Sequence, residues 1–288
     1  MSRIEDALKK LRVQGERPVV SPTTPSTRLG TIAPRAHAYA GHQIVINTEQ
    51  LRTSGLLAPD AEERRLAEQY RTIKRPLLRN ADPNLDPPID RGNLIMVGSA
   101  LANEGKTFTC VNLCLSIARE RDWSVVLVDA DCSKPHLTRL FGAESERGLT
   151  DLLRDHALSF ESLVMPTDVP GLSLLPAGTP DSHASELLAS KRMDEICSRL
   201  STDSVGRMIV FDSSPLLLTT EAPVLASKVG QVVVVVRANE TPQQAVLAAL
   251  EKLDHSKAIG CVLNQSWGTT DLTEGYAYHG YGETAKQG

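Results

Sequence analysis

The stretch that decides the fold is ALANEGKT, residues 100–107. It follows the apolar run LIMV at 94–97 and precedes FTCVNLCLSIARER, which has the character of a helix. A buried strand, a loop of small residues and a helix that opens on Gly-Lys-Thr form a phosphate cradle, because backbone N–H groups and the helix dipole point at one anion. Lys106 can reach the β- and γ-phosphates, and the Thr107 hydroxyl is placed to bind Mg²⁺. The sequence therefore predicts nucleotide binding.

One position departs from the GxxxxGK[ST] pattern, since Ala100 stands where the pattern has glycine and Gly98 lies two residues earlier. Alanine is tolerated there at negative φ, because the position then requires small size rather than left-handed geometry. We expect the nucleotide to contact the loop and the first helical turn, namely Ala102, Asn103, Glu104, Gly105, Lys106, Thr107 and Phe108.

Composition limits the class of protein. The chain has 288 residues with 41% hydrophobic and 4% aromatic residues, which suits a large α/β core built from aliphatic side chains. A net charge of −4 argues against a general nucleic-acid binder, so no nucleic-acid partner is expected. No run approaches the ~18–20 apolar residues of a membrane span. Five cysteines without clustered spacing fit reduced thiols, and a cytoplasmic location is expected.

Strand and helix patterns alternate clearly after residue 93. Expected strands cover 94–99, 124–130, 172–176, 207–212, 231–237 and 258–264, and expected helical segments cover 106–121, 135–156, 190–201, 221–228 and 242–254. Several strands, such as SVVLVDA and QVVVVVRA, are continuous apolar runs, which is typical of strands buried on both faces. The predicted fold is α/β, a doubly wound and mainly parallel sheet.

Segments outside this domain differ in character. Residues 1–13 are expected to form a short amphipathic helix with Ile4, Leu8 and Leu11 on one face, which either docks on this protein or serves a partner. Residues 14–59 are rich in Pro, Ser and Thr and are expected to be a flexible linker. The nucleotide domain is expected over 60–265, and the Tyr/Gly-rich tail over 266–288 is expected to be mobile.

A helix signal opens the domain at residue 60. Asp60 is the expected N-cap, and Leu66, Tyr70, Ile73 and Leu77 form one apolar stripe. Pro76 should kink or end this helix near its last turn. The other face carries Glu68, Arg71, Lys74 and Arg75 at helical spacing, a charge pattern that usually means a solvated face.

Acidic residues follow two of the predicted strands. Asp129 and Asp131 end the strand after the phosphate-loop helix, and Asp212 ends another. Ligands sit at the carboxyl ends of the strands in open parallel sheets, so these acids should meet the loop. Carboxylates beside Mg·ATP either hold the metal or accept a proton from the attacking hydroxyl, whereas an aspartate after a strand is elsewhere often a helix cap. Metal-assisted phosphoryl transfer follows from this chemistry; a water acceptor would make an ATPase and a hydroxyl acceptor a kinase.

Several motifs resemble those of the bacterial tyrosine kinases (BY-kinases), a P-loop branch shared with partitioning and septum-positioning ATPases. ALANEGKT resembles their Walker A motif, LVDADCSKP their Walker A′, and FDSSP at 211–215 their Walker B. Glu68-x-x-Arg71-x-x-Lys74 is similar to their ExxRxxR assembly motif. SRIEDALKKL, LLPAGTPDSHASELLAS and SPLLLTTEAPVLASKVGQVVVVVRANETPQ further resemble the cytoplasmic autokinases of exosortase (PEP-CTERM) exopolysaccharide clusters.

The resemblance implies ATP and Mg²⁺ as cofactors and a role for each matched residue. Lys106 would bind phosphates, Thr107, Asp129 and Asp212 would serve the metal, and Asp129 or Asp131 would be the base. Asn264 would lie near the adenine. Glu68, Arg71 and Lys74 would form the face by which subunits assemble into a ring, and Tyr276, Tyr278 and Tyr281 would be the acceptors in a neighbour's active site.

The resemblance also implies a membrane-bound chain-length-determinant or co-polymerase protein as activator, with this chain peripheral at the inner membrane and regulating exopolysaccharide polymerisation and export. Two departures weaken the match: Ser133 replaces an arginine common after the Walker A′ acids, with Lys134 next, and Lys74 replaces the last arginine of the assembly motif. Two alternatives stay open. One is a positioning ATPase, although the early loop lacks that class's lysine, and the other is a nucleotide-binding scaffold that no longer catalyses.

Overall fold

The computed structural model describes residues 39, 42–202 and 206–266. Seven strands form one sheet in the order β3-β4-β2-β5-β1-β6-β7. All neighbouring pairs are parallel except β3 with β4. The strands are β1 Leu94–Ser99, β2 Ser124–Asp129, β3 Met165–Pro166, β4 Leu172–Leu175, β5 Arg207–Asp212, β6 Gln231–Arg237 and β7 Ala258–Asn264.

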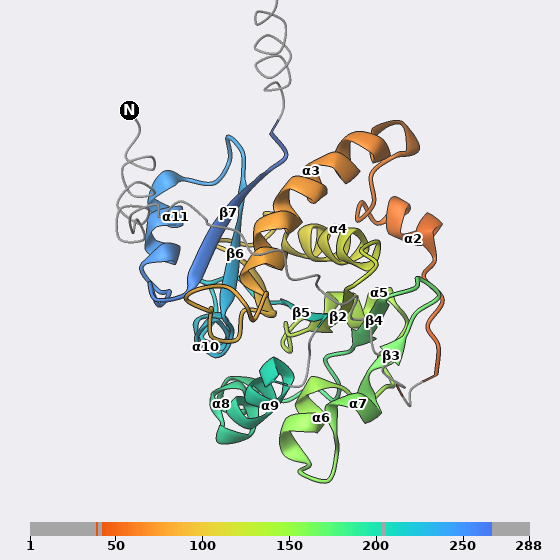
Figure 1. Ribbon diagram of the computed structural model, residues 1–288, viewed down its shortest axis with the longest axis vertical. Coiled ribbons are helices and arrows are strands. Elements are labelled where there is room, and N and C mark those ends of the chain that lie inside the picture. The colour runs from red at the N-terminus through yellow and green to blue at the C-terminus, as the bar shows by residue number, and fades with distance from the viewer. Residues whose placement is uncertain (1–38, 40–41, 203–205, 267–288) are drawn as a thin grey trace, which may run out of the picture.

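Helices cover both faces of this sheet (Figure 1). On one face lie α2 Thr48–Thr53, α3 Asp60–Asn80, α4 Lys106–Ala118 and α5 His136–Leu140. On the other lie α6 Leu149–Arg154, α7 Phe160–Leu163, α8 Ala184–Ala189, α9 Lys191–Thr202, α10 Glu221–Lys228 and α11 Gln243–Leu250. The predicted doubly wound fold is therefore confirmed.

Alternation along β1, an internal strand of the sheet, explains why both faces are covered. Leu94 and Met96 on β1 enter the core beneath α9 and α10, whereas Ile95 and Val97 enter the core beneath α3 and α4. All four side chains are completely buried. A strand buried on both faces needs apolar residues at every position, which is the continuous run that its sequence displays.

Part of the expected linker is packed structure, so the prediction of a flexible linker over 14–59 is wrong for residues 42–59. The Ile44 N–H donates to Pro166 O at 2.9 Å, and Ile44 forms a parallel bridge with Thr167 beside β3. Leu51 on α2 is only 2% exposed, and Leu56 O accepts from Asn112 on α4. Apolar side chains are too irregularly spaced here for a periodic signal, and packing against the sheet edge and α4 fixes them instead.

Helix α3 has the predicted apolar stripe but different ends. Tyr70 and Leu77 are buried, and Leu66 and Ile73 pack against the same core. The N-cap is Pro59 rather than Asp60, and the helix continues past Pro76 to Asn80. Proline removes one backbone donor, but the burial of Leu77 and a 2.9 Å hydrogen bond from Asn80 Nδ2 to Gln231 Oε1 hold the last turn in place. In the part of the chain that the structure describes, no helix is both long and apolar enough to cross a bilayer.

Candidate nucleotide-binding site

The loop after β1 has the geometry of a phosphate cradle. Within it the left-handed residues are Asn103, at φ 62°, and Gly105, at φ 95°, so Ala100 meets the condition for replacing glycine. Gly105 has a second requirement, because a Cβ there would lie 2.0 Å from Nδ2 of Asn264. Lys106 and Thr107 then begin α4 directly after the glycine, with the N-terminus of the helix at the loop.

Two of the predicted carboxylates meet beside this loop. Asp129 and Asp212 end neighbouring strands and are register partners across the β2–β5 pair. The Thr107 hydroxyl donates to Asp212 Oδ2 at 2.7 Å, so the start of α4 touches the end of β5. Both carboxylates are buried, at 0% and 2% exposure. The structure thus brings Thr107, Asp129 and Asp212 to one edge of the sheet, as the sequence predicts.

Asp129 is held on one side only. Its Oδ2 accepts from both the backbone N–H and the hydroxyl of Thr138, each at 2.8 Å. Its Oδ1 is buried and has no hydrogen-bond partner among the described residues. A buried carboxylate oxygen without a partner costs free energy, and such an oxygen is explained by a ligand that completes it.

Burial dominates the ionisation of this group of acids. Burial, together with the charge of Asp129, raises the pKa of Asp212 to about 7, although the hydrogen bond from Thr107 acts in the opposite direction. Burial likewise raises the pKa of Asp129 to about 6, against the hydrogen bonds from Thr138. The pKa of the half-buried Asp131 is also raised by burial, and the charges of Lys106 and Lys134 lower it. The acids are therefore close enough to Lys106 and to each other for their charges to interact.

This donor set fits Mg²⁺. Carboxylate and hydroxyl oxygens are the ligands that Mg²⁺ takes in nucleotide sites, usually one or two from protein with phosphate and water completing the shell. Among the described residues no group of three or more His, Cys, Asp or Glu could hold a metal ion by itself. The arrangement therefore suits a metal that arrives with the phosphates, with Thr107, Asp212 and the free oxygen of Asp129 on the protein side.

Other predicted contacts occupy different places. Asn264, at the end of β7, donates from Nδ2 to Glu104 O at 2.9 Å and so touches the loop itself. The ring of Phe108 lies 6.5 Å from the ring of Tyr70 and packs toward α3, so its side chain is part of the contact between α3 and α4. The Glu104 carboxylate is buried and accepts from the Leu101 N–H at 2.6 Å, so it is turned away from solvent.

The departure after the Walker A′ acids has a local consequence. The exposed Ser133 hydroxyl lies 3.4 Å from Glu221 Oε1, on α10. Lys134 is the cation next to Asp131, because its backbone N–H donates to Asp131 Oδ1 at 3.1 Å and its charge lowers the pKa of that acid. A positive charge is thus present near Asp131 although the arginine is missing.

The residues of the expected assembly face differ in their exposure to solvent. Glu68 and Arg71 are exposed and form an ion pair of 3.7 Å on α3. Lys74 is 5% exposed, and its Nζ donates to Ser116 O and pairs with Glu120 Oε1, both at 2.6 Å. Placing Lys74 on the assembly face is therefore wrong, because α4 lies against that side of α3 and takes the lysine. The amphipathic helix at 1–13 and the acceptors Tyr276, Tyr278 and Tyr281 lie outside the described residues.

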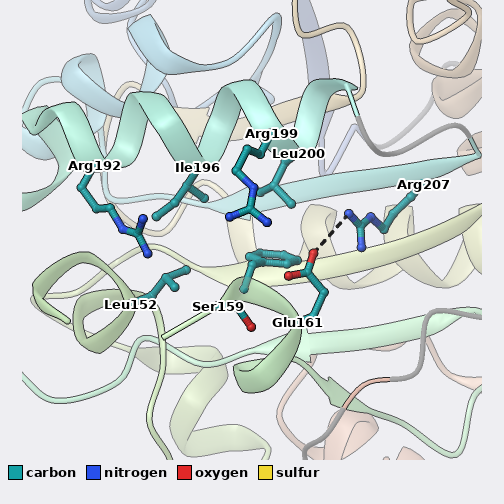
Figure 2. A pocket seen from close by; sticks show the side chains of 9 residues that line it. Leu152, Ser159, Glu161, Arg192, Ile196, Arg199, Leu200 and Arg207 are labelled. Carbon is teal, nitrogen blue, oxygen red and sulfur yellow. Dashed lines mark ion pairs between the residues drawn. The ribbon is translucent and has the colours of Figure 1, made fainter. Parts of the chain in front are cut away.

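A second cavity lies on the α6–α9 face of the sheet (Figure 2). Arg192 and Arg199 reach toward it from α9, and Arg207 from β5 pairs with Glu161 at 3.8 Å. Arg207 is 1% exposed and lies 5.7 Å from the centre of the Phe160 ring. The cavity is about 20 Å³, which holds one water and excludes a nucleotide. It is therefore no rival to the loop as a nucleotide site.

Three residues of the site escaped the sequence analysis. Thr138 holds Asp129, Cys110 lies 3.6 Å from Asp212 Oδ1, and the Thr241 hydroxyl bonds the Glu104 carboxylate. Thr241 and Glu104 are 137 residues apart, so no local pattern could join them. The sequence did indicate a position for Cys110, because it lies one helical turn after Lys106 and therefore on the same side of the predicted helix.

Comparisons with known proteins identify the family of this chain. No family model matches the chain. The tyrosine-protein kinase YwqD of Bacillus subtilis is 31% identical over 202 residues, which are 69% of this chain and 80% of YwqD. The tyrosine-protein kinase Wzc of Salmonella typhi is 28% identical over 193 residues, and the match spans 66% of this chain but only 26% of Wzc.

Solved structures give the same picture. The VpsO kinase domain superposes with a TM-score of 0.59 at 29% identity, and the match covers 72% of this chain and all of that domain. This chain belongs to the bacterial tyrosine-kinase (BY-kinase) family of P-loop proteins.

Proposed function

We propose that the protein is an ATP-dependent protein-tyrosine autokinase. The observation that carries this proposal is the buried pair Asp129 and Asp212 beside the phosphate loop, with one oxygen of Asp129 left without a partner. A pair of buried carboxylates is costly without a cation, so their position next to Lys106 and Thr107 favours a bound metal–nucleotide. Family membership makes phosphoryl transfer to tyrosine the reaction with the best support.

Each side chain has a role in that reaction. Lys106 holds the β- and γ-phosphates, while Thr107, Asp212 and Asp129 would hold Mg²⁺, which neutralises charge on the phosphates. Asp129 is fully buried and Asp131 half-buried, so Asp131 is the carboxylate that a tyrosine from outside can reach. The bond between the γ-phosphorus and the β–γ bridging oxygen breaks, a bond to the tyrosine oxygen forms, the phenolic proton passes to the carboxylate, and ADP leaves.

The acceptors we propose are Tyr276, Tyr278 and Tyr281 of a neighbouring subunit. Exposed Glu68 and Arg71 would contribute to the contact between subunits, next to a groove of about 740 Å³ between α3 and β7. The groove includes the apolar Leu66, Tyr70 and Ile73, so it offers both charge and apolar surface to a second copy. Each phosphate adds about −1.5 to −2 charge, and phosphorylated tails would repel one another and open the ring.

We further propose that cycling between ring and monomer regulates exopolysaccharide polymerisation and export. The activator would be a membrane-bound co-polymerase whose cytoplasmic segment docks on this protein, which would place the kinase in the cytoplasm beside the inner membrane. Assignment to the exosortase-associated subgroup stays a prediction from the sequence motifs.

The experiment that tests this function is phosphotyrosine mapping by mass spectrometry. Purified protein is incubated with ATP and Mg²⁺, with and without the activator's cytoplasmic segment, and compared with Lys106→Met. The exposed Lys252→Met serves as matched control. Label on the three tail tyrosines that disappears in Lys106→Met and persists in Lys252→Met supports the kinase.

Two other results would redirect the proposal. ATP turnover without phosphotyrosine would favour the positioning-type ATPase. ATP binding without turnover or label would favour a scaffold, with Ser133 in place of arginine as the first residue to restore.

A further inference from the structure

Glu104 places a carboxylate inside the loop that has to bind a triphosphate. Its side chain is 3% exposed and lies one residue before Gly105, at the base of the cradle. A negative charge at this point repels the phosphates if it faces them, because the surroundings are poorly hydrated and screening is weak. The direction in which this carboxylate points therefore bears on nucleotide affinity.

Two donors hold the carboxylate, one from the phosphate loop itself and one from the turn after β6. Oε2 accepts from the Leu101 N–H at 2.6 Å, and Oε1 accepts from the Thr241 hydroxyl. The Arg237 N–H donates to the same hydroxyl oxygen of Thr241 at 3.0 Å. A threonine hydroxyl has one hydrogen, and since Arg237 occupies a lone pair, that hydrogen is left for Glu104.

Thr241 is itself fixed. The turn from Arg237 to Thr241 is closed by the Thr241 N–H, which donates to Arg237 O at 3.1 Å. Asn239 within it has a left-handed φ of 61°. On the other side of Glu104, Asn264 at the end of β7 binds the Glu104 carbonyl at 2.9 Å. Thr241, in the turn after β6, thus binds the Glu104 carboxylate, and Asn264, at the end of β7, binds the Glu104 carbonyl.

We propose that Thr241 is a positioning residue for nucleotide binding, which holds the Glu104 carboxylate turned away from the phosphates. The inference rests on the ATP binding of the proposed function. Without the Thr241 hydroxyl the carboxylate loses one of its two donors and is free to rotate toward the cradle. Phosphate affinity then falls through charge repulsion in addition to any loosening of the loop.

The test is nucleotide affinity, measured by calorimetry with Mg·ATP and with Mg·ADP for the full chain. Thr241→Val removes the hydroxyl at nearly constant volume, and Thr241→Ser restores it. The double variant Thr241→Val with Glu104→Gln removes the charge that the valine releases. Thr202→Val is the matched control, because that hydroxyl bonds carbonyls of its own helix, away from the phosphate loop.

We expect Thr241→Val to weaken ATP binding by about tenfold, the usual size for a hydrogen bond to a charged group. The loss should be smaller for ADP and should shrink as salt is added, since its cause is charge. Thr241→Ser and the double variant should recover most of the affinity, and the control should match the wild type.

Unchanged ATP affinity in Thr241→Val would overturn the proposal. So would an equal loss for ATP and ADP that Glu104→Gln fails to relieve, because that pattern means a purely structural role. If the valine variant does not fold, Thr241→Ala takes its place in the same comparison. Failure of the wild type to bind ATP would instead contradict the proposed function.

Discussion

Two regions of this molecule bury charged side chains, and the protein compensates the charge in only one of them. At the phosphate loop, Asp129 and Asp212 lie side by side, and one oxygen of Asp129 has no partner among the described residues. Beneath α9, the guanidinium of the buried Arg207 lies against the Phe160 ring and pairs with Glu161. In the first region, burial and, to a smaller extent, the neighbouring acid raise the pKa values of Asp212 and Asp129, whereas in the second region the charge of Arg207 is paired with that of Glu161.

This difference separates a site from a structural cluster. A buried charge that the protein compensates contributes to the fold, and replacing it changes stability. A buried charge that the protein leaves uncompensated costs stability until a ligand binds, and replacing it changes function. The four predictions below test this distinction.

The largest effect is expected for Asp212→Asn on phosphoryl transfer. Loss of this metal-directed charge should slow phosphotyrosine formation at saturating Mg·ATP by about 1,000-fold, on the order of 4 kcal/mol of barrier. Asp194→Asn is the matched control. Asp194 lies away from the loop and pairs with Lys228 at a distance of 2.8 Å, so the rate of this variant should equal that of the wild type. A rate for Asp212→Asn above one tenth of the wild-type rate would show that Asp212 has no role in phosphoryl transfer.

The same variant should gain stability when no nucleotide is present. The pKa of Asp212 is about 7 in the folded chain and 3.8 in the unfolded chain, so the folded state binds the proton more tightly. Wild-type stability therefore falls as pH rises from about 4 to 7, and Asp212→Asn avoids this loss. We expect the variant to be more stable by on the order of 3 kcal/mol at pH 8 and by little at pH 4.5, measured by urea unfolding. A pH-independent difference would contradict the raised pKa.

Arg207→Met tests the compensated region. Methionine keeps the length and apolar contact of the stem but loses the ion pair and the contact with Phe160. We expect a loss of about 2 kcal/mol in unfolding free energy, less than for a fully buried pair, because Glu161 is 41% exposed and can rehydrate. ATP affinity should not change. A fall in ATP affinity at unchanged stability would mean that Arg207 belongs to a functional site and not to a structural cluster.

The smallest effects are expected on α3, where two basic residues three positions apart have different environments. Lys74→Met removes a buried ion pair with Glu120 and should cost about 1–2 kcal/mol in stability. Arg71→Ala breaks an exposed pair and should change stability by less than about 0.5 kcal/mol. If Arg71 assists assembly, size-exclusion chromatography with light scattering will show smaller oligomers for Arg71→Ala at the same stability. Equal oligomer size in both variants would leave Arg71 as a solvated residue.

The sequence by itself determined the parts of this protein that depend on local pattern. Continuous apolar runs predicted β1, β5 and β6 at the residues where they occur, because a strand covered on both faces is apolar at every position. The edge strand β7 also lies where it was predicted, although it is only partly buried. The phosphate loop and the acids at the ends of β2 and β5 followed as well. Parallel strands bring their carboxyl ends to one edge, so the topology alone placed Asp129 and Asp212 together.

Only the tertiary structure decided which of the remaining polar residues are surface and which are internal. Helical spacing placed Lys74 with Arg71, but α4 lies against that side of α3 and buries the lysine. Residues 42–59 have no periodic signal, yet Ile44, Ile46 and Leu51 are buried in the packed structure. The bond between Thr241 and Glu104 joins residues far apart in the chain. The local pattern of apolar and polar residues predicts which side of a segment is buried. The residues that this side contacts depend on how distant segments pack.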